Sequence, residues 1–174
     1  MTATVLVAVT LVPDGARAAE HPQDGFSMGF VLGDPSGLTL RGGIGERMAI
    51  QAHFGFSPFP GDAVAVMVDW TYDAWDLLKG NSTASLYLFF GIGAKGQWFT
   101  GRYYAYHDKH YDHYLADQSH FGLGVRGLLG LRASFRKAPI DIFFELAPIG
   151  IIFVVPDAGV YYDIDAALGL RYRF

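Results

Sequence analysis

The segment from Tyr162 to Phe174 alternates strictly between two kinds of side chain. Charged or small residues separate the apolar positions, which are Tyr162, Ile164, Ala166, Leu168, Leu170, Tyr172 and Phe174. Because successive side chains of a β-strand point to opposite faces, this pattern predicts a strand with one wholly apolar face. A soluble protein would bury that face against a second layer, whereas a transmembrane barrel would turn it toward lipid. The surroundings of this face therefore decide what kind of protein the chain is.

Seven earlier segments repeat the alternation, mostly with short turns between them. They lie at residues 26–33, 38–44, 48–56, 64–72, 84–99, 119–135 and 140–147, and residues 149–155 are apolar throughout. Residues 73–82 break the pattern and could hold one helical turn. Closure of such a meander removes its free edges. We therefore expect an all-β fold, an eight-stranded antiparallel up-and-down transmembrane β-barrel whose narrow lumen is filled by side chains.

The composition favours a membrane barrel and excludes several other classes. Hydrophobic residues make up 51% of the chain and charged residues 17%, below the roughly 25% charged content of soluble domains. No run of about 18 apolar residues could form a spanning helix. The net charge of −4 gives no electrostatic attraction for nucleic acid. The absence of cysteine excludes disulfides and thiolate sites.

The first residues have features of an export signal. An apolar run at residues 2–12 precedes a Pro-Asp-Gly turn, and Ala16 and Ala18 occupy the −3 and −1 positions of an A-x-A cleavage site. We expect a cleaved signal peptide over 1–18 and a single barrel domain over 19–174. No basic residue precedes Arg17, which suggests a start site upstream of Met1; an ordinary first strand is the alternative.

Gly169, Tyr172 and Phe174 have the spacing of a known assembly signal. The segment resembles the terminal motif of bacterial outer-membrane β-barrel proteins: Gly, two variable residues, an aromatic, one variable residue and a final aromatic. Leu168 stands where that family usually has a polar residue. The resemblance implies insertion into outer-membrane lipid by the barrel assembly machinery, with both termini periplasmic. It also places outside the loops near residues 34, 58, 100–118 and 157. The looser likeness to small eight-stranded barrels implies no activity.

Strand parity predicts which charged side chains point inward. They are Arg41, Asp69, Lys95, Arg126, Arg132, Asp141, Glu145, Asp163, Asp165, Arg171 and Arg173. Charges in a narrow lumen must pair, since an unpaired buried charge costs several kcal/mol. The pairs to expect first are Arg126 or Arg132 with Asp141 or Glu145, and Glu145 with Arg171. We interpret this set as a structural plug, with a proton or ion path as the alternative.

The longest segment without alternation, residues 100–118, is rich in Tyr, His and Asp. His107, His110 and His113 are candidate ligands for Zn²⁺ or Cu²⁺. A solvated loop with interfacial tyrosines fits their spacing better, so we expect no metal. Tyr and His also suit binding of an extracellular ligand at this loop. His53 is expected to be a hydrogen-bonded interior histidine.

The sequence offers little support for catalysis. Ser119 and His120 are the one adjacent Ser/His pair, and parity sends them to opposite faces. No carboxylate spacing completes a triad. We expect a non-enzymatic outer-membrane protein without cofactors, with a structural or surface-interaction role. The alternatives are a lipid-modifying outer-membrane enzyme and a soluble lipocalin-like carrier.

Overall fold

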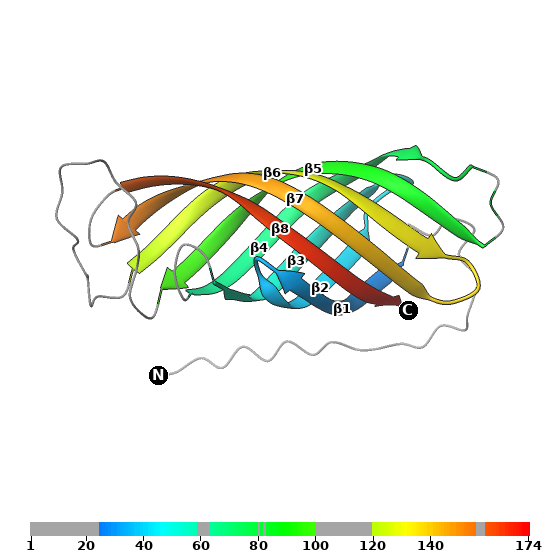
Figure 1. Cartoon of the computed structure of the whole chain (residues 1–174), viewed down its shortest axis with the longest axis horizontal. Helices are drawn as coiled ribbons and strands as arrows, with labels where there is room; N and C mark the ends of the chain where they lie inside the picture. Colours follow the sequence, from blue (N-terminus) through cyan, green and yellow to red (C-terminus); the bar gives the residue numbers. More distant parts are fainter. Residues whose placement is uncertain (1–24, 59–62, 80, 82, 100–119, 156–158) are drawn as a thin grey trace, which may run out of the picture.

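The computed structural model is a closed barrel of eight antiparallel strands (Figure 1). It describes residues 25–58, 63–79, 81, 83–99, 120–155 and 159–174. The strands are β1 Phe26–Gly33, β2 Ser36–Gly43, β3 Met48–Ser57, β4 Ala63–Asp76, β5 Ala84–Phe99, β6 His120–Phe135, β7 Ile140–Val155 and β8 Gly159–Arg173. Each strand pairs with its neighbours in sequence, and β8 pairs with β1. The predicted all-β, eight-stranded antiparallel barrel is confirmed.

Two parts of the sequence prediction lie outside the described residues: the signal peptide over 1–18 and the external loop over 100–118. Within the described ranges, no helix could cross a membrane. We call the end of the barrel with the β2–β3, β4–β5 and β6–β7 connections the turn end, and the opposite end the loop end. The C-terminal end of β8 lies at the turn end (Figure 1).

Strand β4 continues past its predicted end to Asp76, and residues 77–79, in the segment that could have held a helical turn, form a turn. Asp73 pairs with Phe89 and Asp76 with Tyr87, with a register shift between Asp73 and Trp75. Such a bulge puts two residues opposite one and so changes the parity of the side chains beyond it. The loss of alternation in this segment therefore comes from an irregular strand.

Strand β7 includes the segment whose side chains do not alternate in polarity. Ile149 and Ile151 are buried inside the barrel, where they pack with Ala63 and Phe99, while Ile152 is exposed on the outer wall. A small apolar cluster thus lies on the inner face of the strand, so both of its faces carry apolar residues there. This explains a strand without the usual polar and apolar alternation.

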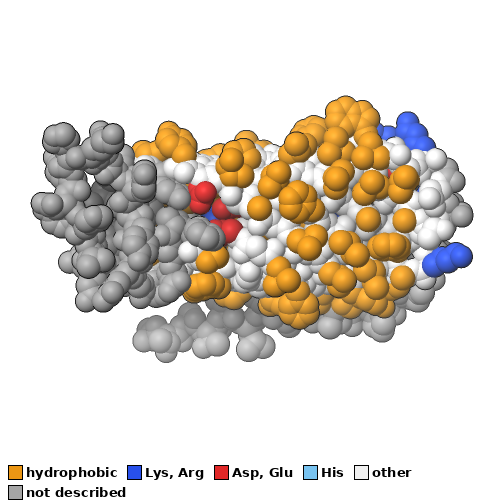
Figure 2. Space-filling view, viewed as in Figure 1, with side chains coloured by type: hydrophobic (Ala, Val, Ile, Leu, Met, Phe, Trp, Pro, Cys, Tyr) orange, Lys and Arg blue, Asp and Glu red, His pale blue; other side chains and the backbone are white. Residues whose placement is uncertain are grey.

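The two faces of the barrel differ sharply in chemistry. Large apolar side chains such as Val125 and Ile164, each 66% exposed, point outward, whereas Arg126 and Asp165 are almost fully buried. In Figure 2 hydrophobic side chains spread over the wall, and Lys and Arg gather at the turn end. The barrel thus has an apolar exterior and a charged interior.

Close backbone approach at the β1–β8 seam requires glycine. Gly33 has a φ of 130°, in the left-handed region that side chains other than glycine rarely adopt. A Cβ at Gly33 or at Gly29 would overlap the backbone of β8, at Ala166 and Leu170 respectively. Glycine at both positions allows the strands to close the barrel.

Candidate functional site

Ionisable side chains fill much of the described interior. Five basic and six acidic side chains are buried: Arg41, Lys95, Arg126, Arg132, Arg171, Asp34, Asp69, Asp73, Asp141, Glu145 and Asp165. They include every residue of the lumen network proposed from the sequence. Asp34 and Asp73 were missed, because one lies in a predicted turn and the other next to the bulge. The two further inward candidates, Asp163 and Arg173, are partly exposed.

Arg126 on β6 contacts carboxylates from three other strands. Its Nη2 lies 2.8 Å from Glu145 Oε1 on β7, its Nη1 lies 3.3 Å from Asp165 Oδ2 on β8, and its Nε lies 3.3 Å from Asp69 Oδ1 on β4. Gly93 lies opposite Arg126 in the β5–β6 register. A Cβ at Gly93 would overlap the Asp69 carboxylate. The glycine therefore leaves room for the charges at this level.

Lys95 organises the network toward the loop end. Its Nζ lies 2.9 Å from both Asp34 Oδ1 and Asp165 Oδ1. Ser57 Oγ donates a hydrogen bond to the same Asp34 oxygen, and Gln97 Nε2 donates to Ser57 Oγ at 2.8 Å. These contacts connect the β1–β2 turn to β3, β5 and β8, so the lysine joins parts of the wall that are not adjacent in the sheet.

A second group of ion pairs lies toward the turn end. Asp73 Oδ2 accepts hydrogen bonds from Arg41 Nη2, at 3.1 Å, and from Arg132 Nη2. Asp141 lies between Arg132, at 3.7 Å, and Arg173, at 3.4 Å. The guanidinium of Arg132 also lies 4.9 Å from the centroid of the Tyr87 ring, a cation–π distance. Basic side chains outnumber acidic ones in this group.

The structure brings together two of the predicted pairs, Arg126 with Glu145 and Arg132 with Asp141. It does not bring Arg171 into an ion pair with Glu145 in the described part of the chain. Arg171 instead donates to Thr39 Oγ1 at 2.9 Å and Gln51 Oε1 at 3.1 Å.

Gln51 links Arg171 to two carboxylates of the Arg126 group. Its Nε2 donates to Glu145 Oε2 at 3.0 Å and to Asp69 Oδ2 at 3.3 Å, while its Oε1 accepts from Arg171. The sequence analysis missed this residue because it is uncharged. Its inward parity on β3, opposite Asp69 in the register, was the available signal.

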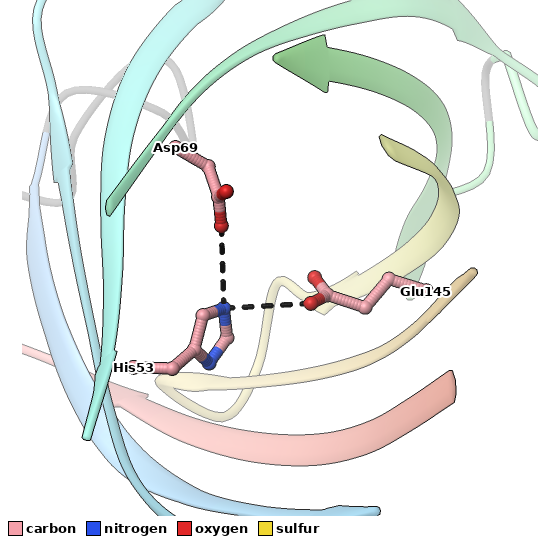
Figure 3. A group of neighbouring side chains, drawn as sticks. All are labelled: His53, Asp69 and Glu145. Atoms are coloured by element: carbon pink, nitrogen blue, oxygen red, sulfur yellow. Dashed lines mark ion pairs between the residues drawn. The ribbon is translucent and has the colours of Figure 1, made fainter. Parts of the chain in front are cut away.

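His53, Asp69 and Glu145 meet at the centre of the interior (Figure 3). His53 Nε2 lies 3.5 Å from Glu145 Oε1 and 3.8 Å from Asp69 Oδ2. The three side chains are buried, and they are the one group among the described residues whose ligand atoms could hold a metal ion. The predicted interior position of His53 is correct. Its predicted hydrogen bond is wrong, because neither ring nitrogen has a hydrogen-bond partner in the described structure.

The residues of the proposed assembly signal lie on both faces of β8. Tyr172 and Phe174 are exposed on the outer wall with ring centroids 5.1 Å apart, and Phe26 of β1 lies 5.9 Å from Phe174. Gly169 faces inward against the Phe143 ring. The outward aromatics thus extend across the β1–β8 seam.

The other sequence candidates cannot be placed. His107, His110, His113 and Ser119 lie outside the described residues, as does the side chain of His120. The loop metal site and the Ser/His pair therefore stay predictions.

Comparisons with models of protein families, with curated proteins and with solved structures found no match.

Proposed function

We propose that the chain is an integral β-barrel protein of the bacterial outer membrane, exported through a cleaved signal peptide. In this proposal the lumen is filled by side chains, and the protein has a structural or surface-interaction role without enzymatic activity. Lipid surrounds the apolar wall, and the barrel assembly machinery inserts the chain by recognising Gly169, Tyr172 and Phe174.

The observation that carries the proposal is the distribution of polarity between the two faces. Val68, Ile92 and Leu123 point outward from the adjacent strands β4, β5 and β6, and each is at least half exposed. A soluble carrier barrel would place such residues around its ligand and give charged residues to water. This chain has the reverse arrangement, which is the one that a hydrocarbon solvent favours.

Exposed aromatic side chains near both ends of the barrel also support the proposal. At the turn end they are Phe26, Trp75, Tyr172 and Phe174; toward the loop end they are Phe56, Trp98, Phe121 and Tyr162. Tyr and Trp are enriched where hydrocarbon meets the polar headgroups, because each combines an apolar ring with a polar group, and transmembrane barrels carry girdles of aromatic residues at both interfaces. The two groups fit the two interfaces of a bilayer.

The ion pairs of the interior support a lumen that does not conduct. Arg126 and Lys95 reach across the barrel to carboxylates on several strands, and an eight-stranded barrel has little interior volume beyond its side chains. Passage of ions would require these pairs to separate. In this proposal the plug holds the wall in shape, and any extracellular ligand binds at residues 100–118.

Cell fractionation and bilayer recording test the proposal. We expect the mature chain in the outer-membrane fraction, with release only by detergent and without stable large conductance in a planar bilayer. Recovery in the soluble periplasm without detergent would contradict the membrane assignment. Stable large currents would contradict the filled lumen. Altered lipid A in cells that overexpress the chain would contradict the non-enzymatic assignment.

A further inference from the structure

We propose that His53, Asp69 and Glu145 form an interior site for a divalent transition metal ion of the Zn²⁺ type. The proposal is independent of the membrane assignment, because it rests on the geometry inside the barrel. The three residues come from β3, β4 and β7, so a bound ion would join three strands. Imidazole nitrogen and carboxylate oxygen are usual ligands of Zn²⁺.

The spacing of the three ligand atoms fits metal coordination. Tetrahedral zinc with ligands at about 2.0–2.2 Å requires ligand atoms roughly 3.3–3.6 Å apart. His53 Nε2 lies 3.5 Å from Glu145 Oε1 and 3.8 Å from Asp69 Oδ2. All three ligand atoms lie within 4.8 Å of one another, so a movement of about 1 Å would complete the set, with a fourth position left for a non-protein ligand. Figure 3 shows both carboxylates directed at the same imidazole nitrogen.

The burial of His53 without a hydrogen-bond partner is a second, independent observation that supports a metal site. The residue is 1% exposed, and neither of its nitrogens has a hydrogen-bond partner in the described structure. The separations of 3.5 and 3.8 Å from the two carboxylates exceed good hydrogen-bond lengths. A buried polar group normally has a partner, and coordination of a metal would supply one for Nε2.

The local charge favours a cation. Arg126 and Lys95, with the four carboxylates that they contact, form a connected group. Gln51 links Arg171 to this group as a third base. Three bases and four acids leave an excess of one negative charge while His53 is neutral, which favours a bound cation. Arg126 opposes binding by its own charge. Its contact with Asp69 uses Oδ1 and leaves free of Arg126 the oxygen nearest His53, Oδ2. Its contact with Glu145 uses Oε1, the oxygen nearest His53, so a bound ion would have to share Oε1 with the guanidinium.

Gln51 would orient the carboxylates. Its Nε2 donates to Asp69 Oδ2 and to Glu145 Oε2, which holds both groups beside His53. Hydrogen bonds of this kind to metal-bound carboxylates fix their direction and raise affinity. The glutamine thus positions the ligands and does not itself bind the ion.

The test uses the full chain, refolded in detergent in the presence of Co²⁺ or Zn²⁺ so that the ion need not enter a closed barrel. Histidine occurs six times in the sequence, so the parent carries Ala at positions 21, 107, 110, 113 and 120 and keeps His53. After removal of free metal we expect about one metal ion to remain bound per chain. The Co²⁺-loaded protein should show the visible absorption bands of Co²⁺ with four or five ligands, and the urea concentration at the unfolding midpoint should be higher than without metal.

Variants locate the binding. H53Q and E145Q should lose the retained equivalent and the metal-dependent shift in midpoint. The matched control is D141N, which removes an equally buried carboxylate outside the cluster and should retain the ion. Folding of each variant is checked by its β-sheet circular dichroism and by a cooperative urea transition, which do not depend on the membrane assignment. If neither site variant folds, X-ray absorption of the Zn²⁺-loaded parent should detect one imidazole with oxygen ligands.

Three results would overturn the proposal. They are a folded parent that retains no metal, equal retention by parent and H53Q, and an absorption spectrum without imidazole. Loss of the ion from folded D141N would also count against it, since binding would then not depend on this cluster in particular.

Discussion

The phenyl ring of Phe143 occupies the space that a side chain at Gly169 would need. The two residues are paired across β7 and β8, and a Cβ at position 169 would overlap the ring edge. The face of the same ring lies 3.8 Å from the guanidinium carbon of Arg171. The absence of a side chain at Gly169 thus leaves room for the Phe143 ring, which makes a cation–π contact with the buried Arg171.

Replacing Gly169 with Ala should destabilise the barrel by about 1–3 kcal/mol, the usual cost of overpacking. The ring must move away from Arg171 and from Val31 and Ala167, with which it packs. Urea unfolding of the refolded protein measures the loss. Gly127→Ala is the control, because nothing lies within 4 Å of a Cβ there. Equal stability of the two variants would contradict the overlap.

Arg126→Met should cost about 3–5 kcal/mol, because removal of one partner leaves buried carboxylates without compensation. Glu145 loses its 2.8 Å contact, and Asp69 and Asp165 lose theirs. The same measurement on Lys137→Met, at an exposed turn position, should show no change. A stable Arg126→Met protein would mean that other groups neutralise these acids.

Lys95 and Asp34 should be energetically coupled. Their atoms lie 2.9 Å apart in the buried interior, and residues in such contact couple by about 0.5–3 kcal/mol in double-mutant cycles. The cycle combines Lys95→Met and Asp34→Asn, with unfolding free energies as the readout. Lys95→Met combined with Asp141→Asn, which share no partner, should be additive. Additivity in both cycles would show that the 2.9 Å contact does not stabilise the fold.

Ile92→Arg tests what surrounds the wall. Ile92 is 59% exposed in the middle of β5. In a bilayer an outward Arg near the midplane should cost about 2–4 kcal/mol, so folding into lipid vesicles should be weakened relative to Glu46→Arg in a turn. In water the same change would replace an exposed apolar group with a charged one and should raise solubility. The two environments are distinguished because the substitution should weaken folding in lipid but raise solubility in water.

The sequence predicted the wall of the barrel more fully than its interior. The positions of the strands could be predicted from the two-residue period of apolar side chains. A shift of one residue in the register would turn the apolar side chains inward and the charged ones outward. The prediction failed near Asp73 because the bulge there changes the parity of the side chains. In the sequence this change looks like the end of a strand. Arg126 with Glu145 could be predicted, since these residues lie on adjacent strands and share a face.

Contacts across the lumen could not be predicted in the same way. The meeting of His53 with Glu145 joins β3 to β7, and the meeting of Lys95 with Asp34 joins β5 to the β1–β2 turn. Such pairs depend on the tilt and stagger of the strands, which set the width of the barrel and the level of each side chain. The alternation of apolar and polar residues determines neither the tilt nor the stagger of the strands.

Barrel closure also has a kinetic consequence. Seven of the eight pairings join strands that are consecutive in the chain, and only β1 with β8 joins distant ones. That pairing has seven residue pairs, against sixteen between β5 and β6. Contacts between distant segments form slowly, because the intervening chain must first be ordered. We therefore expect the joining of β1 to β8 to be the last folding step. Until that step, the protein would be a sheet with two free edges able to pair with other chains.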